Sequence, residues 1–291
     1  MILRSARVLL FLREHAELAR LPIYADYVAP AAGEDRFHHL SRRFYLAKNL
    51  SLRERVECIL AHYRFEEASF SPTYKLKVYR SGGLMLWSKL VGETHCALHL
   101  VLADRYAAEG DLSITLTVNG EVLHSIDFSW VCGKFAGSKA AMLPFVSANQ
   151  GRWRRDHHVH DKFNATFPLS APNFFCYAAM QGLAQAIGVT EVIGVSSELQ
   201  VCYSSDDVKH FHNAYEAFWE AVGGVALAPR GYRLPVPQPM KPLSEVAAKH
   251  RKRSALRRAA LKEISDAAFA VIAAHFQGPA ARRNRSGRDI A

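Results

Sequence analysis

The sequence predicts an α+β fold in which a mostly antiparallel sheet is flanked by helices. Residues 74–146 read as strands, because apolar and polar side chains alternate there and glycine turns separate the runs. Residues 172–235 then read in the order helix, strand, helix, strand. A chain of 291 residues with 49% hydrophobic residues is long enough and apolar enough to build a substantial core, so wholesale disorder is excluded.

The elements of residues 172–235 have clear boundaries. Pro172 suits the first turn of a helix and Gly188 its end, with a mostly apolar run between them. Residues 189–197 switch to β-branched residues, which predicts a buried strand. A second helix is expected from His212 to Gly223-Gly224, and residues 232–235 supply the closing strand.

Two hairpins are expected in the β region. One is predicted at Gly82-Gly83, between strands that begin at Tyr74 and Leu84. The stronger signal is Asn119-Gly120, which lies between two alternating runs. A further strand is expected at residues 142–148. Four or five antiparallel strands therefore precede the helix–strand–helix–strand unit.

Helices are expected before and after the sheet. Residues 34–68 read as helical, and Ser51 with Glu54 forms a capping box at the start of the second stretch. We expect three parts: residues 1–70 as an N-terminal helical region, residues 71–235 as the α+β core, and residues 236–291 as a proline-rich linker with a basic helix.

The net charge of +10 is concentrated at the C-terminal end. From Lys241 to Ala291 there are 12 Lys/Arg and 4 Asp/Glu, which gives +8, so the first 240 residues carry only about +2. Anionic lipid, nucleic acid such as tRNA, or an acidic protein would each suit this basic helix, and so would plain exposure to solvent.

The cysteines and the N-terminus point to a reduced compartment. Five cysteines are scattered without a Cys-x-x-Cys pair, which favours core thiols over a metal knuckle or a disulfide framework. Residues 8–12 form an apolar run, but Arg13 interrupts it, and neither a signal peptide nor a membrane span is predicted. We expect a cytoplasmic protein, possible at the inner membrane only as a peripheral one.

Several segments together resemble the VirK/YbjX family of bacterial proteins, which are grouped by a domain of unknown function. The matching segments are residues 45–63, 92–100, 109–120, 147–152, 187–197, 215–224, 232–235 and 249–258. Where family members carry a Lys-Thr-Gly-Leu-Arg-Pro-like passage, this chain has residues 161–173, which keep only Lys162 and Pro172 of it. The resemblance implies a role in envelope or virulence traits and in tolerance of cationic antimicrobial peptides, without an established reaction.

The order of the elements also resembles that of acetyltransferases of the GNAT superfamily, which implies a GNAT-like core and an acyl-CoA, acyl or aminoacyl donor. Phosphates of such a donor need backbone amides and positive charge after a strand. Gln150, Gly151, Arg152 and Arg154 have that composition and position. A solvated basic loop is the alternative reading of the same residues.

GNAT-like folds contain two parallel strands that separate in a V and leave main-chain groups free for the donor. In this chain the two strands are those expected at residues 142–148 and 190–196. Ser147 and Asn149, at the end of the first strand, are expected to line the polar mouth of the V. On this reading Ser147→Trp blocks activity without unfolding the protein; the alternative is a continuous sheet.

Four residues are candidates for catalysis. Glu93 and His95 are expected on a strand, on the same face, where either can act as general base. Tyr215 can replace the tyrosine with which GNAT enzymes protonate the leaving thiolate. His158 belongs to a dense polar cluster, residues 156–162, that can contact substrate, ligate a metal or simply face water.

The sequence therefore predicts an acyltransferase-like enzyme that moves an acyl or aminoacyl group from a thioester or tRNA ester to an amine or hydroxyl acceptor. The acceptor is a small molecule or a peptide, and no metal is expected. The alternative is a non-catalytic, envelope-associated protein that docks through its basic helix on anionic lipid, tRNA or an acidic partner.

Overall fold

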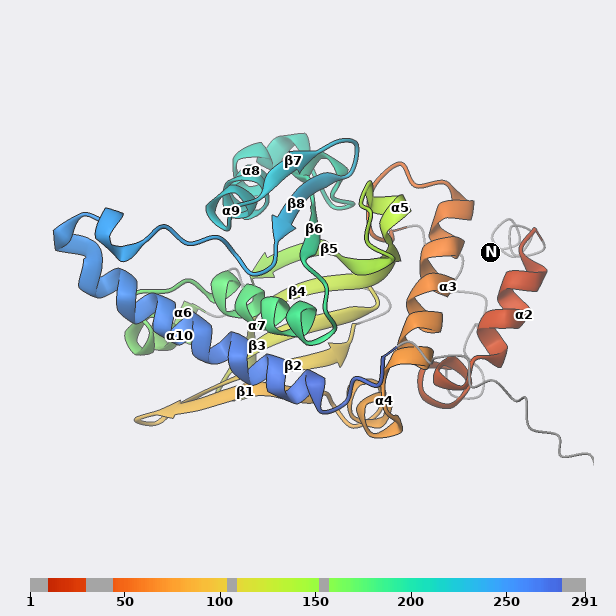
Figure 1. Cartoon of the computed structure of the whole chain (residues 1–291), viewed down its shortest axis with the longest axis horizontal. Helices are drawn as coiled ribbons and strands as arrows, with labels where there is room; N and C mark the ends of the chain where they lie inside the picture. Colours follow the sequence, from red (N-terminus) through yellow and green to blue (C-terminus); the bar gives the residue numbers. More distant parts are fainter. Residues whose placement is uncertain (1–9, 30–43, 104–108, 152–156, 279–291) are drawn as a thin grey trace, which may run out of the picture.

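The computed structural model describes residues 10–29, 44–103, 109–151 and 157–278, which form a single mixed sheet with helices packed around it (Figure 1). The eight strands follow the order β1-β2-β3-β4-β5-β6-β8-β7. Their bounds are β1 Leu84–Val91, β2 Thr94–Leu102, β3 Leu112–Val118, β4 Glu121–Cys132, β5 Met142–Gly151, β6 Glu191–Val195, β7 Val225–Leu227 and β8 Gly231–Pro235.

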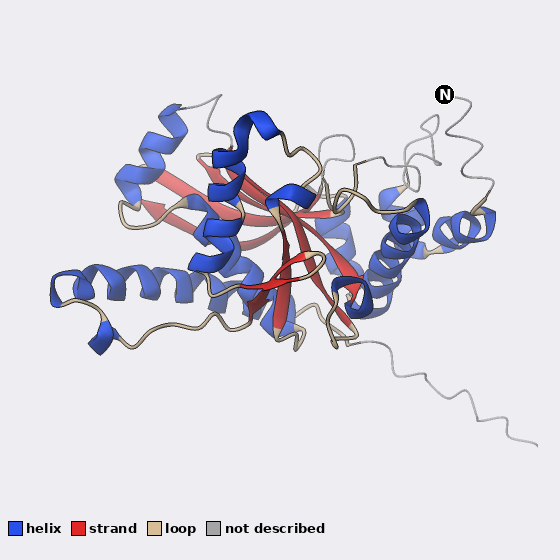
Figure 2. Ribbon diagram, turned by 90° about the horizontal axis from the view of Figure 1, so that it is seen from above, coloured by secondary structure: helices blue, strands red, loops and turns tan. Residues whose placement is uncertain are grey.

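The described helices lie before, between and after these strands. Their bounds are α2 Leu12–Arg20, α3 Leu52–Ser69, α4 Pro72–Tyr79, α5 Gly133–Ala136, α6 His157–Thr166, α7 Pro172–Ala186, α8 Val208–Ala214, α9 Glu216–Ala221 and α10 Ala248–Ala273. A π-helical segment, Ile23–Val28, follows α2. Helices α7 and α10 lie side by side (Figure 1). Figure 2 shows from above that the strands form one twisted sheet.

The expected α+β class is confirmed, and all neighbouring strands are antiparallel except β5 and β6. The Asn119-Gly120 hairpin joins β3 to β4 as predicted. Both residues have positive φ, 50° and 84°, which is the backbone of the tight turns that suit the twist of paired strands.

The hairpin predicted at Gly82-Gly83 is wrong, because residues 72–79 form helix α4 and the two glycines only connect it to β1. The helix begins at a Ser-Pro pair. Ser71 accepts a hydrogen bond from the backbone N–H of Tyr74, and Pro72 occupies the first turn. These start signals and the burial of one helix face outweigh the alternation in the sequence.

A helix is expected at residues 34–49, but residues 44–49, the part of this range that the structure describes, are not helical. Residues 44–49 form bends and turns, and Leu46 and Asn49 have φ near 60°. Residues 30–43 lie outside the described residues. The helix that follows, α3, has the predicted capping box between Ser51 and Glu54.

One face of the sheet is apolar and is covered by α7. Leu100, Ile114 and Ile126 form a cross-strand row on this face and are fully buried. Helix α7 runs between Pro172 and Ala186, close to the predicted limits, and contacts β3, β4 and β5. The C-terminal half of α10, which belongs to the third predicted part of the chain, packs on α7 of the second part.

Gly182 makes the close packing of α7 on α10 possible. A Cβ atom at this position would lie within about 3 Å of Ser265 O, Ala268 Cβ and Phe269 N. Ile264, Ala268 and Ile272 of α10 are consequently fully buried against the body of the protein.

Strands β5 and β6 pair over two positions only, Phe145 with Ile193 and Val146 with Gly194. After Val146 the register between β4 and β5 shifts, and Ser147 is the extra residue of a β-bulge. Strand β5 continues to Gly151, whereas β6 ends at Val195. The two parallel strands therefore stop pairing at the bulge.

The helix predicted from His212 to Gly223 is two short helices. Helices α8 and α9 meet at Tyr215, whose φ of −116° and ψ of −80° are not helical. This break places Tyr215 beside β5, where it forms the centre of the site described below.

Candidate functional site

The space beside the ends of β5 and β6 is filled by two aromatic side chains of the α8–α9 segment. The hydroxyl of Tyr215 lies 3.4 Å from the backbone N of Asn149 and accepts its hydrogen bond. The indole Nε1 of Trp219 donates to the carbonyl oxygen of Val195 at 2.9 Å. Main-chain groups that lose a strand partner where β5 and β6 stop pairing are thus satisfied by side chains.

Asn149 connects this aromatic pair to the apolar face of the sheet. Its amide Nδ2 donates to the carbonyl of Ala214 at 2.7 Å, and its Oδ1 lies 2.8 Å from His124 Nε2, which therefore donates. Burial lowers the pKa of His124 to about 4, although the Asn149 hydrogen bond opposes this and nearby His160 adds to it. His124 is thus a neutral imidazole at neutral pH.

The environment of Tyr215 keeps its phenol protonated. Burial raises the pKa of Tyr215 well above its ordinary value, and the negative charges of Glu109 and Asp127 raise it further. Both carboxylates are themselves buried. The Gln200 side-chain Nε2 donates to both oxygens of Glu109, at 2.5 and 2.6 Å. Tyr215 is accordingly protonated in this site, so its O–H can donate a hydrogen bond while its oxygen accepts from the Asn149 N–H.

A row of polar side chains crosses the other face of the sheet, opposite to the buried row of Leu100, Ile114 and Ile126. His99, Thr115, Ser125 and Gln150 are cross-strand partners on β2, β3, β4 and β5, and therefore share one face. We call these four residues the polar row. All four are at least partly exposed, in contrast to the opposite face. Burial lowers the pKa of His99, and neighbouring His95 adds to the effect.

The donor-binding residues expected from the sequence fall at the end of β5. Asn149 is buried within the site, Gln150 is exposed on the polar row, and Gly151 closes the strand. Arg152 and Arg154 lie outside the described residues.

Ser147 does not line an open mouth, contrary to the expectation. It is fully buried, and its hydroxyl donates to the carbonyl of Asp127 at 3.2 Å. The reason is the bulge, which turns the extra residue towards β4. The sequence contains no signal that separates a bulge residue from an ordinary strand residue at this place.

The catalytic candidates are spread over three places. Tyr215 lies in the site. Glu93 is in the exposed turn between β1 and β2, and not on the expected strand, while His95 is exposed on β2. Three strand spacings, roughly 14 Å, separate β2 from β5. His158 is exposed on α6. The structure does not bring these three residues to Tyr215.

The structure adds residues that sequence reasoning missed, namely His124, Glu109, Asp127 and Gln200. Each lies in or beside a strongly apolar segment, and a buried polar side chain in such a segment is a usable signal. Across the described residues, no group of three or more His, Cys, Asp or Glu side chains is placed to hold a metal ion.

Comparison with known proteins shows the family of this chain. The profile of a family described as "Protein of unknown function (DUF535)" matches residues 28–269. The chain belongs to the DUF535 family. The uncharacterized protein YbjX of Escherichia coli (strain K12) is 31% identical over 243 residues, covering 81% of this chain and 71% of YbjX. The resemblance to the VirK/YbjX family seen in the sequence is thereby confirmed.

No solved structure matches this DUF535 protein. Within the described ranges, none of its helices is both long enough and apolar enough to cross a membrane.

Proposed function

We propose that this DUF535 protein is an acyltransferase-like enzyme with a GNAT-like core, which transfers an acyl or aminoacyl group from a thioester or tRNA ester to an amine or hydroxyl. The observation that carries the proposal is the end of pairing between β5 and β6 after Val146, with the Tyr215 hydroxyl at the edge of β5. Parallel strands that separate beside a buried phenol match the arrangement that a thioester donor requires in GNAT-like folds.

Tyr215 is proposed to donate a proton or a hydrogen bond to the leaving group. Its raised pKa keeps the phenol protonated at neutral pH. The backbone of Asn149 and the side chain of Gln150 hold the donor beside it, and Gly151 permits close approach of the backbone. Arg152 and Arg154, which follow in the sequence, supply positive charge for the donor's phosphates.

In this proposal, donor binding requires two main-chain groups to exchange their hydrogen-bond partners. The Asn149 N–H and the Val195 carbonyl are occupied by Tyr215 and Trp219. Helices α8 and α9 are short, and their junction at Tyr215 is not helical. The donor is therefore proposed to take over these two main-chain groups, while the Tyr215 and Trp219 side chains turn aside and the Tyr215 hydroxyl stays next to the leaving group.

The base is reassigned in this proposal. Glu109 and Asp127 lie near enough to raise the pKa of Tyr215, whereas Glu93 and His95 lie at β2, three strand spacings from β5. The acceptor is proposed to lie over the polar row with its nucleophile directed to one of these two carboxylates. Glu93 and His95 then contact only the far end of a large acceptor.

Isothermal titration with acetyl-CoA, a long-chain acyl-CoA, an acylated carrier protein and an aminoacyl-tRNA tests the proposal. We expect at least one donor to bind and to change the fluorescence of Trp219, since its indole hydrogen bond is displaced. Tyr215→Phe should retain binding and lose most donor turnover, while Tyr177→Phe, on α7, should change neither. Absence of binding by the folded protein to all four donors would contradict the proposal.

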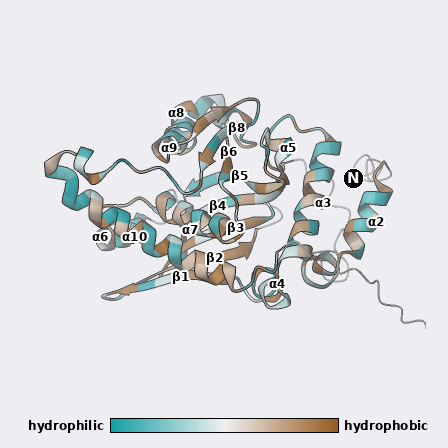
Figure 3. Ribbon diagram, viewed as in Figure 1, coloured by the Kyte–Doolittle hydropathy of each residue, from teal (hydrophilic) through white to brown (hydrophobic). Residues whose placement is uncertain are grey.

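A second candidate function is docking on an anionic membrane surface through α10. Residues 249–262 hold seven Lys/Arg and no Asp/Glu, and no residue of α10 before Ile264 is buried. Figure 3 shows this half of the helix as largely hydrophilic. Leu256 is exposed on this half of the helix and Leu243 is exposed shortly before it, as expected for a helix that contacts both headgroups and acyl chains.

Vesicle flotation separates the two functions. Docking predicts binding to phosphatidylglycerol vesicles and not to phosphatidylcholine vesicles, with loss in the double variant Lys252→Glu/Arg253→Glu. The matched double variant Lys134→Glu/Lys139→Glu carries the same charge change elsewhere and should still bind. Equal binding by both double variants would rule out a specific role for α10.

A further inference from the structure

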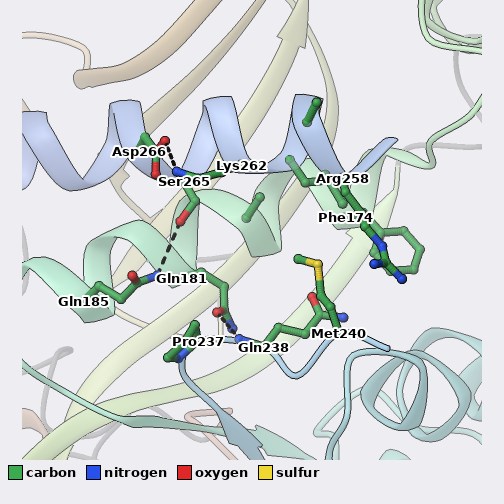
Figure 4. A pocket seen from close by; sticks show the side chains of 13 residues that line it. Phe174, Gln181, Gln185, Pro237, Gln238, Met240, Arg258, Lys262, Ser265 and Asp266 are labelled. Atoms are coloured by element: carbon green, nitrogen blue, oxygen red, sulfur yellow. Dashed lines mark hydrogen bonds and ion pairs between the residues drawn. The ribbon is translucent and has the colours of Figure 1, made fainter. Parts of the chain in front are cut away.

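A pocket of about 350 Å³ lies between α7, α10 and the segment that follows β8, outside the site of Tyr215 (Figure 4). This volume is at the lower end of the range found for small-molecule sites. The pocket is lined by residues of these three elements: Phe174, Ala178, Gln181, Gln185, Pro237, Gln238, Met240, Arg258, Ala259, Leu261, Lys262, Ser265 and Asp266.

The walls of the pocket are mainly apolar. Phe174, Ala178 and Leu261 come from the two packed helices, while Pro237 and Met240 come from the segment opposite them. Met240 is 49% exposed, so its side chain is accessible to a ligand that enters the pocket. Figure 4 shows Met240 on the side of the pocket facing α10. These walls suit a hydrocarbon chain.

Most polar groups of the pocket already have partners. Gln181 accepts from the N–H of Gln238 at 2.8 Å and donates to a carbonyl of β8. Lys262 forms an ion pair with Asp266, 2.5 Å between Nζ and Oδ2, so their charges compensate one another. These groups fix the shape of the pocket and leave little capacity for a ligand.

Arg258 differs from the other polar groups. Its guanidinium forms no hydrogen bond or ion pair with any side chain or backbone group in the described ranges. It lies next to Phe174 at one end of the pocket in Figure 4, and the neighbouring Arg257 is stacked 5.5 Å from the centre of the Phe174 ring. This end of the pocket therefore carries uncompensated positive charge above an apolar floor.

We propose that this pocket binds a small anionic amphiphile, namely a medium-length hydrocarbon chain that ends in one carboxylate. The chain lies against Phe174, Met240 and Leu261, and the carboxylate accepts a bidentate hydrogen bond from Arg258. A guanidinium matches a carboxylate in geometry, and charge-assisted pairs of this type are the stronger ones. The proposal is independent of the acyltransferase proposal, because no residue of the Tyr215 site takes part.

The probe is decanoate, compared with the uncharged decan-1-ol, both below the concentration at which decanoate forms micelles. Binding is followed by titration calorimetry and by the NMR signal of the Met240 methyl group in the full-length protein. We expect decanoate to shift the Met240 signal and to bind more tightly than decan-1-ol. Arg258→Gln should weaken decanoate binding about tenfold and leave decan-1-ol unchanged.

Two variants serve as controls. Arg253→Gln removes an exposed charge on the same helix outside the pocket, and should leave decanoate binding unchanged. Ala259→Trp places a large ring on the exposed rim of the pocket and should block both probes without disturbing the core. Equal affinity for the two probes, an unshifted Met240 signal, or undiminished binding by either Arg258→Gln or Ala259→Trp would overturn the proposal.

Discussion

The hydroxyl of Tyr215 accepts a hydrogen bond from the backbone N–H of Asn149, with 3.4 Å between the oxygen and the nitrogen. This contact joins the break between α8 and α9 to the strand that has just lost its parallel neighbour. Through this contact the α8–α9 segment supplies a hydrogen-bond acceptor to strand β5. A ligand can therefore reach the Asn149 N–H only if Tyr215 gives up this hydrogen bond.

Tyr215→Phe should preserve the fold, because the ring keeps its packing, and should lower the free energy of unfolding by about 1 kcal/mol. The Asn149 amide loses its acceptor, and its hydrogen exchange should become faster than in the wild type. Urea denaturation and amide exchange measure the two effects. Unchanged exchange at Asn149 would show that the contact is not maintained in solution.

Ser147→Trp is now expected to prevent folding, since Ser147 is fully buried at the bulge. An indole has no space at this fully buried position. Overpacking of a protein core typically lowers the free energy of unfolding by about 1–3 kcal/mol. Thermal denaturation followed by circular dichroism measures the effect. Gln150→Trp, three residues further and exposed, is the control and should melt like the wild type.

Gly194→Ala should destabilise the protein through Trp219. A Cβ atom at position 194 would lie 2.6 Å from Cε2 of the Trp219 indole, closer than real contacts permit. We expect a loss of about 1–3 kcal/mol in the free energy of unfolding. In a double-mutant cycle, Trp219→Phe should relieve part of this loss because the smaller ring leaves room. If the losses caused by Gly194→Ala and Trp219→Phe were simply additive, the indole of Trp219 would not be in contact with position 194.

Glu66 should make the stability of the protein depend on pH. Its Oε1 accepts hydrogen bonds from Trp130 Nε1 at 2.6 Å and from Tyr74 at 3.2 Å. Burial raises the pKa of Glu66 from 4.5 to about 7, against the opposing effect of these hydrogen bonds. The folded state therefore holds a proton that the unfolded state releases above pH 4.5. The resulting stabilisation is fully present below pH 4.5 and is lost as pH rises to about 7.

The pH profile of urea denaturation tests this for Glu66→Gln. A shift of this size corresponds to a change on the order of 3 kcal/mol between pH 4.5 and 7. The glutamine variant keeps the shape without the charge, so its profile should be flatter across that interval. A profile parallel to the wild type would mean that Glu66 is ionised in the folded protein. Glu57→Gln, on the exposed side of α3, is the matched control.

Deletion of residues 241–291 should unfold the protein, and so cannot separate docking from catalysis. The deletion removes Ile264, Ala268 and Ile272, which are fully buried, and exposes the side of α7 that contains Gly182. Each large buried side chain contributes roughly 1.5–3 kcal/mol. Expression and circular dichroism of the truncated chain measure the outcome. A folded, soluble truncation would show that α10 is dispensable for the core.

Local signals in the sequence were sufficient where a few neighbouring residues decide the backbone. The Asn119-Gly120 turn, the Ser51–Glu54 capping box and the limits of α7 all depend on interactions within four or five residues. The α+β class, α7 and the strands β6 and β8 also followed from local patterns, whereas the division of the next helix into α8 and α9 and the short strand β7 did not. Family membership followed from segments spread over most of the chain.

Tertiary structure decided what depends on contacts between distant segments. Residues 74–79 alternate like a strand, but the burial of one side and the Ser71 cap make them a helix. The bulge at Ser147 depends on how β5 pairs with β4 and stops pairing with β6. The site of Tyr215 brings together residues more than 60 positions apart in the sequence, such as Asn149 and Tyr215. No local pattern specifies such contacts, because they are selected by the packing of the whole core.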